Sequence, residues 1–280
     1  QGVRRDEGVT EAQRIKFFQD AKKELQPRIP VHTVLLPAPT GDPAAPGLYW
    51  ELANATRGRL MSPAKAVIAP RTHLAFVVDT SGSMRDPNGG GLWPIVIDTI
   101  EATLAAHPQL VGVQLLDGDG RFILGRKGTG AAGWLTHTPE TRESIKRVLS
   151  RYNQDTVSNP VPGIYNAIRF LHDKDAPDLR MGIYVLGDEF NSSDPADSVV
   201  QRLDQLNPAD ATGRRSIVIN AFGFPTTIRF RSSMGNTGLR FANLMRLLTH
   251  DHDGSFVALL GPSAEPGIRS MAEQRPRGRG

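Results

Sequence analysis

The sequence lacks cysteine altogether, and it has neither a long apolar run nor a strong excess of charge of one sign. Without cysteine the chain forms no disulfide, holds no metal through a thiolate and uses no cysteine nucleophile. No stretch approaches the roughly 18 consecutive apolar residues that a membrane-spanning helix needs. What remains is a chain of 280 residues, 39% hydrophobic and 22% charged, which is long enough to bury a core of useful size.

The net charge is +4, but Lys and Arg are interleaved with Asp and Glu along the chain. Because nucleic-acid-binding proteins gather basic residues into a patch or stripe, we do not expect a nucleic acid as partner. The densest basic stretch falls in residues 261–280, whose composition predicts a disordered tail. Since the chain begins with Gln1, we expect its natural N-terminus to be cleaved or to lie upstream. The compartment stays open, with an extracytoplasmic or cell-surface location favoured.

The most informative stretch is residues 73–84, which read HLAFVVDTSGSM. Leu74 to Val78 is apolar on both faces and too short for a helix, which is typical of a buried parallel strand. Asp79 follows at its end, with Ser81 and Ser83 two and four residues further on. Open α/β sheets bind ligands at this edge, and such oxygen ligands suit Mg²⁺ or Mn²⁺. One carboxylate with neutral hydroxyls would leave charge on the ion for an acidic group of another molecule.

At these residues the chain resembles the von Willebrand factor A family, whose metal-ion-dependent adhesion site has the pattern D-x-S-x-S after the first strand. Asp79, Ser81 and Ser83 match that pattern. The resemblance implies a Mg²⁺ ion, with Mn²⁺ or Ca²⁺ as alternatives, held by three loops at one edge of the sheet. It also implies a non-catalytic role in adhesion or interaction, in which an acidic side chain of a protein ligand completes the coordination of the ion.

Residues 73–260 alternate between strand and helix patterns. Besides the first strand, the predicted strands are 110–116, 121–124, 180–186, 216–222 and 255–260, and the predicted helices are 92–106, 139–151, 163–172, 197–206 and 239–249. The sequence Asp117-Gly118-Asp119-Gly120 predicts a hairpin between the strands on either side of it. We therefore predict a doubly wound, mostly parallel α/β sheet flanked by helices, with one antiparallel edge strand. The family resemblance implies the same Rossmann-like order.

The third loop of the site follows the strand at 180–186 and begins Gly187-Asp188-Glu189. The family usually places an Asp before a Gly here. Asp188 matches the Asp, while Glu189 stands in place of the Gly. We expect Asp188 to reach the metal directly or through water. The alternative is that Asp188 merely starts a turn and that Asp194 caps the next helix.

The second loop departs from the family pattern. Residues 163–168 resemble the start of the helix that follows the family's second-loop Thr. Counting back along the chain lands on Pro162, whose side chain has no ligand atom. We expect Ser158 or Thr156 from the preceding loop to supply the hydroxyl instead. Loss of the second-loop hydroxyl would weaken binding of the ion and change how a bound acidic ligand is sensed.

Residues 10–63 form a weak internal repeat of residues 194–260. Both read helix, strand, loop, helix, Gly, strand, with predicted elements at 10–28, 30–36, 48–55 and 59–62 in the first copy. A Thr shortly precedes the closing glycine in each, Thr56 before Gly58 and Thr249 before Gly254. We therefore predict an N-terminal segment (1–72), which is either the end of a first von Willebrand A-like domain or an extension packed on a single domain. The complete domain (73–260) and the tail (261–280) follow.

Two other functions compete with protein binding. The domain could be an accessory subunit of an ATPase or metal-insertion complex, as some family members are. It could also be a metal-dependent hydrolase, for which Glu189 is the nearby candidate base. The tract His250-Asp251-His252-Asp253 has the composition of a metal site, but it lies between a helix and a strand, where polar residues are expected. The partner's identity and the oligomeric state are not encoded in any motif of the sequence.

Overall fold

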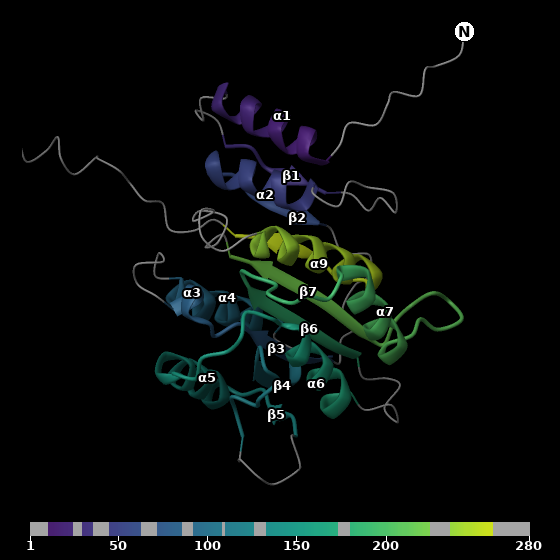
Figure 1. Cartoon of the computed structure of the whole chain (residues 1–280). Helices are drawn as coiled ribbons and strands as arrows, with labels where there is room; N and C mark the ends of the chain where they lie inside the picture. The colour runs from purple at the N-terminus through teal and green to yellow at the C-terminus, as the bar shows by residue number, and fades with distance from the viewer. Residues whose placement is uncertain are drawn as a thin grey trace, which may run out of the picture.

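The computed structural model describes residues 11–24, 30–35, 45–62, 72–85, 92–107, 110–125, 133–172, 180–224 and 236–259. Their strands form one sheet in the order β1-β2-β8-β7-β6-β3-β4-β5, with helices packed on it (Figure 1). The strands are β1 (Thr33–Val34), β2 (Leu60–Ser62), β3 (Thr72–Val78), β4 (Leu110–Asp117), β5 (Leu135–Thr136), β6 (Arg180–Gly187), β7 (Ile217–Gly223) and β8 (Phe256–Ala258). The helices are α1 (Glu11–Glu24), α2 (Ala45–Ala55), α3 (Gly82–Arg85), α4 (Trp93–Ala105), α5 (Pro139–Arg151), α6 (Val161–Leu171), α7 (Ala196–Leu206) and α9 (Thr237–Asp251).

The centre of the sheet is parallel, with β3 between β4 and β6 and with β7 beyond β6. The chain runs from β3 outward to β4 on one side and later returns to β6 on the other. The strand order therefore reverses between β3 and β6. Crevices at such switch points, outside the carboxyl ends of the strands, are where open α/β sheets bind ligands. Asp79 and Asp188 follow these two strands, so the topology brings them to this end of the sheet.

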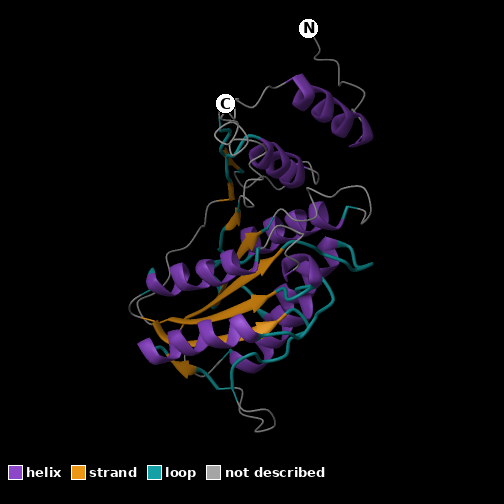
Figure 2. Cartoon of the chain, turned by 90° about the vertical axis from the view of Figure 1, so that its left-hand side faces the viewer, coloured by secondary structure: helices purple, strands orange, loops and turns teal. Residues whose placement is uncertain are grey.

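Alternate residues of the central strands feed two hydrophobic cores. Ala75 and Val77 of β3 face a core shared with α2, α6, α7 and α9. Leu74, Phe76 and Val78 face a second core shared with α4 and α5. Figure 2 shows the helices lying along the strands on both faces of the sheet. Burial on both faces explains why β3 reads as a continuous apolar run.

The predicted doubly wound, mostly parallel fold is confirmed, and its elements fall close to their expected positions. The expected strand at 121–124 is wrong. Phe122 makes a single antiparallel bridge with Leu116, and the chain then bends at Gly125, where a φ of 116° favours glycine. The antiparallel partner of β4 is β5 instead. A second antiparallel contact joins β2 to β8 at the other side of the sheet.

The N-terminal elements extend the same sheet. β1 pairs in parallel with β2, and β2 pairs with β8, so the residues before β3 lengthen the sheet of the following region. Helix α2 packs against α9 on one face of this extension. The division of the chain at residue 72 stays a prediction. In the described parts of the chain, no helix is both long enough and apolar enough to cross a membrane.

Candidate metal site

The first loop places an acidic side chain and two hydroxyls at the end of β3. The backbone N–H of Asp79 donates to the carbonyl oxygen of Leu186 at 2.8 Å, which ties the ends of β3 and β6 together. The N–H of Ser81 donates to Oδ1 of Asp79 at 2.8 Å, so the carboxylate closes a tight local turn. Asp79 and Ser81 are buried. Their oxygens therefore lie at the base of the loop rather than on its surface.

The first and third loops meet through Ser83. Its Oγ lies 3.0 Å from Oγ of Ser81, and it donates to Oδ1 of Asp188 at 3.2 Å. Asp188 and Glu189 follow β6 and are both buried. The four residues expected as ligands from these two loops thus lie close together. The alternative role for Asp194 does not occur, because α7 begins after Pro195 without a side-chain cap.

The second loop places one hydroxyl against the first loop and one against the third. Oγ1 of Thr156 accepts a hydrogen bond from the backbone N–H of Thr80 at 3.2 Å and lies 3.2 Å from the Thr80 hydroxyl. Ser158 interacts with the carboxylate of Glu189 through its side chain, and its carbonyl oxygen accepts from the N–H of Asn191 at 2.7 Å. Both expected second-loop residues therefore lie against the site, Thr156 at the first loop and Ser158 at the third.

The buried carboxyl groups of Asp79 and Glu189 have few interactions that offset their loss of water. Oδ2 of Asp79 and Oε1 of Glu189 are buried without a hydrogen-bond partner in the described part of the protein. The pKa of Asp79 is raised to about 6, chiefly because burial disfavours its charged form, with smaller contributions from the negative charges of Glu189 and Asp155. Hydrogen bonds from Ser81 oppose this shift. Burial likewise raises the pKa of Glu189.

The donor chemistry fits a hard divalent cation. Carboxylate and hydroxyl oxygens are the ligands that Mg²⁺ and Mn²⁺ prefer, and Mg²⁺ retains several waters. Within the described ranges, no group of three or more His, Asp or Glu side chains is arranged to hold a metal by itself. A cation bound here would therefore depend on the serine hydroxyls and on water as well as on the carboxylates.

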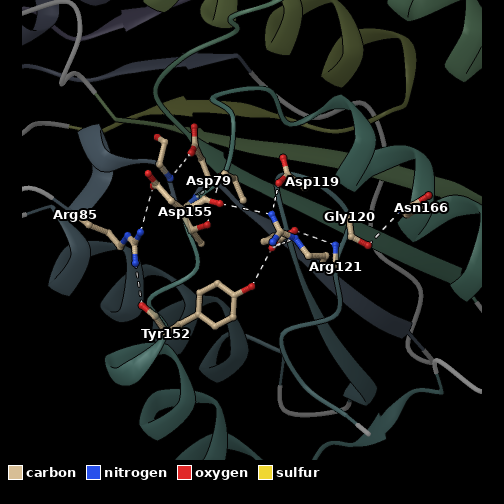
Figure 3. A network of polar contacts seen from close by, with 12 residues as sticks. Asp79, Arg85, Asp119, Gly120, Arg121, Tyr152, Asp155 and Asn166 are labelled. Atoms are coloured by element: carbon tan, nitrogen blue, oxygen red, sulfur yellow. Dashed lines mark hydrogen bonds and ion pairs between the residues drawn. The ribbon is translucent and has the colours of Figure 1, made fainter. Parts of the chain in front are cut away.

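A polar network that the motifs did not predict surrounds the second loop (Figure 3). Asp117 ends β4, and its Oδ2 accepts from the hydroxyl of Tyr152 at 2.9 Å and lies 3.1 Å from Nε of Arg121. Arg85, directly after the first loop, donates to the carbonyl oxygen of Tyr152 at 3.1 Å and to Oδ1 of Asp155 at 3.2 Å. These contacts hold the start of the second loop against the first.

One feature of the sequence, the position of Asp117, could have indicated this network. Asp117 is the last residue of a buried strand, and Asp79 and Asp188 directly follow theirs. Because β4 is the parallel neighbour of β3, the ends of these strands meet at one edge of the sheet. The local sequence around Asp117 predicts only a hairpin turn. The turn does form, since the N–H of Gly120 donates to the carbonyl oxygen of Asp117 at 2.9 Å.

No protein-family model and no curated protein sequence matches the chain. Among solved structures it is similar to a von Willebrand factor type A structure from Catenulispora acidiphila, with 13% identity over 66% of this chain and 43% of that one and a TM-score of 0.43. It is also similar to proximal thread matrix protein 1 from the mussel byssus, with 14% identity over 63% of this chain and 42% of that one and a TM-score of 0.38. The chain spans about two fifths of either structure. Likenesses of this degree carry no argument about function.

Proposed function

We propose that the loops after β3 and β6 bind a divalent cation, Mg²⁺ or Mn²⁺ with Ca²⁺ as an alternative, and that the bound ion captures an acidic side chain of a partner protein. The proposed ligands are Asp79, Ser81, Ser83 and Asp188, with Thr156 or Ser158 contributing from the second loop. The role is non-catalytic: the domain holds a partner and transforms no substrate.

The observation that carries the proposal is the state of the Asp79 carboxyl group. It is 1% exposed, its Oδ2 has no hydrogen-bond partner among the described residues, and its pKa is raised. A buried carboxylate normally needs hydrogen bonds or an opposite charge, because losing water costs several kcal/mol. A cation between the first and third loops would supply that charge.

The neutral hydroxyls of the first loop favour an acidic ligand on the ion. Asp79 is the carboxylate of the first loop, while Ser81 and Ser83 are neutral donors that leave the charge of the ion largely in place. Asp188 already accepts a hydrogen bond from Ser83 at 3.2 Å, which suits contact with the ion directly or through a water. A partner carboxylate can then replace a water on the ion and gain a charge-assisted contact.

Calorimetric titration of Mg²⁺ and Mn²⁺ into the chain tests the proposed site. The parent protein should bind one equivalent of ion, and Asp79→Ala should abolish binding. Glu143→Gln is the matched control, because it also removes one carboxylate but from an exposed side chain on α5, outside the three loops. The proposal is wrong if Asp79→Ala binds the ion as tightly as the parent does.

A second titration tests the acidic partner. Acetate, and a peptide rich in Glu, should bind the Mn²⁺-loaded protein and should not bind Asp79→Ala. Each should displace water from Mn²⁺, which lowers the ion's effect on water-proton relaxation. If relaxation is unchanged at saturating acetate and peptide, the ion does not serve as the anchor for an acidic ligand.

A further inference from the structure

The elements at the two ends of the described chain form matching units. The first unit is α1, β1, α2 and β2, and the second is α7, β7, α9 and β8. In each, the two strands are parallel neighbours and the second helix connects them. The repeat expected from the sequence therefore has a counterpart in three dimensions, element for element.

The ends of the connecting helices match in detail. Arg57 and Asp253, each just before the closing glycine, have φ values of 59° and 57°. The next N–H closes the helix by donating to the carbonyl oxygen five residues back, at 2.7 Å for Gly58 and 2.8 Å for Gly254. A Cβ on either glycine would lie 1.8 Å from a carbonyl oxygen of the preceding strand region, that of Val31 or Ile219. The helix ends thus match in backbone conformation, in the closing hydrogen bond and in the contact of the glycine.

The two units are related by a local twofold axis. Aligning Gly58 with Gly254 makes Met61 the counterpart of Val257, and these two residues face each other in the antiparallel β2–β8 pair. The flanking pairs obey the same symmetry: Leu60 faces Ala258, and Ser62 faces Phe256. α2 and α9 pack together on one face of this joined sheet. The contact is thus isologous, as in a symmetric dimer.

The symmetry breaks at the outer strands. β7 is paired on both sides, with β8 and with β6, whereas β1 ends the described sheet and pairs only with β2. The N–H groups of Thr33 and Leu35 donate to the β2 side at 2.7 and 2.8 Å. Backbone groups alternate in direction along a strand, so the N–H of Val34 faces the outer edge. The Val34 side chain is 55% exposed.

The helix layer breaks the symmetry in the same way. α7 packs against α6, the helix that leads into β6. Its counterpart α1 contacts α2 and carries Phe17, which is 60% exposed. Among the described residues, the first unit therefore presents a strand edge without a paired strand and an exposed aromatic side chain. The second unit covers the equivalent positions with α6 and β6.

We propose that β1 and α1 form a docking surface for a helix and an apolar strand that runs parallel to β1, equivalent to α6 and β6. The occupant is the body of a first α/β domain, of which residues 11–62 are the closing unit. Two such domains would then be joined about the twofold axis at Met61 and Val257. The proposal does not involve the metal site, so each can be tested without the other.

A peptide copy of residues 161–187, which contain α6 and β6, tests the surface. We expect the fluorescein-labelled peptide to bind the full chain saturably in fluorescence anisotropy, and a scrambled peptide of the same composition not to bind. Val34→Pro removes the N–H that faces the edge, and it should weaken binding at least about tenfold, the effect of one lost backbone hydrogen bond. Amide exchange at Val34 in the parent chain should slow when the peptide is present.

Two control variants separate backbone pairing at the edge from contacts of neighbouring side chains. Met61→Lys changes the side chain that faces Val34 on the adjacent strand, and it should leave the affinity within about twofold, because the backbone of the edge is untouched. Val34→Lys retains the N–H and serves if Val34→Pro does not fold; its charge should likewise weaken pairing at the edge. The proposal is refuted by absence of saturable binding, or by saturable binding that the Val34 variants leave unchanged.

Discussion

Replacing Asp79 with Asn should stabilise the metal-free protein at neutral pH. The substitution removes the charge and keeps the shape, and the amide oxygen of the new side chain can still accept the 2.8 Å hydrogen bond from the N–H of Ser81. In the parent, the carboxyl is buried, and its pKa is raised from 3.8 to about 6. Ionising it in the folded state therefore costs free energy that the neutral amide does not cost.

The magnitude follows from the shift in pKa. A shift of about two units at roughly 1.4 kcal/mol each gives about 3 kcal/mol of unfolding free energy. Because the folded pKa lies above the unfolded value, the protonated carboxyl contributes this stability in full below pH 3.8. The contribution is lost as the pH rises through about 6. At pH 7.5 Asp79→Asn should thus be about 3 kcal/mol more stable than the parent, and near pH 3.5 the difference should vanish.

Urea unfolding in the presence of EDTA measures this difference. The control is Glu143→Gln, whose exposed carboxylate on α5 should leave the stability within about 0.5 kcal/mol when it is removed. Saturating Mg²⁺ should reverse the order at pH 7.5, since binding to the folded parent raises its stability and the variant has lost a ligand. The reasoning fails if Asp79→Asn is less stable than the parent in EDTA at pH 7.5.

Further substitutions test the packing around the site and in the repeat. Gly58→Ala and Gly254→Ala should each lower the unfolding free energy by about 3 kcal/mol, because both place a Cβ 1.8 Å from a backbone carbonyl oxygen; a neutral result in urea unfolding at either position would contradict the matched helix ends. Tyr152→Phe should cost about 1 to 2 kcal/mol, because it removes the 2.9 Å hydrogen bond to Asp117, and calorimetry should show weaker Mg²⁺ binding as the second loop loosens. Thr138→Ala should cost about 1 kcal/mol in thermal unfolding, because Thr138 caps α5 by accepting from a backbone N–H at 3.2 Å; an unchanged Tm would count against the cap.

Sequence patterns predicted the fold well where both faces of an element are buried. Residues 74–78 read as an uninterrupted apolar run because β3 packs helices on both sides, and 180–186 reads alike for the same reason. Clear start signals also helped. The range of α5, Pro139 to Arg151, was predicted to the residue, since Thr138 and Pro139 mark the start of the helix. Edge elements were predicted less well. The two-residue strand β5 carries too little pattern to be recognised. The turn at residues 117–120 does form, but the segment after it makes only a single bridge with β4 and does not continue as a strand.

Residues of the candidate site were easier to predict where they lie close together in the sequence. Asp79, Ser81 and Ser83 lie within five residues, and Asp188 directly follows a buried strand, so short patterns place them. The second loop depends on distant contacts instead: Thr156 meets Thr80 across 76 positions of sequence. The buried network of Asp117 was also missed, because the hydroxyl that it accepts from lies 35 residues away. No local pattern reports such a partner.

The central claim is that a divalent cation lies between the loops that follow β3 and β6. Crystals grown with Mn²⁺ and measured at the manganese absorption edge test it most directly. The account predicts one anomalous peak at roughly 2.1 to 2.2 Å from the Oγ atoms of Ser81 and Ser83 and close to Oδ2 of Asp79. A fully ordered site without a peak at saturating Mn²⁺, or a peak elsewhere with these oxygens unmoved, would contradict it.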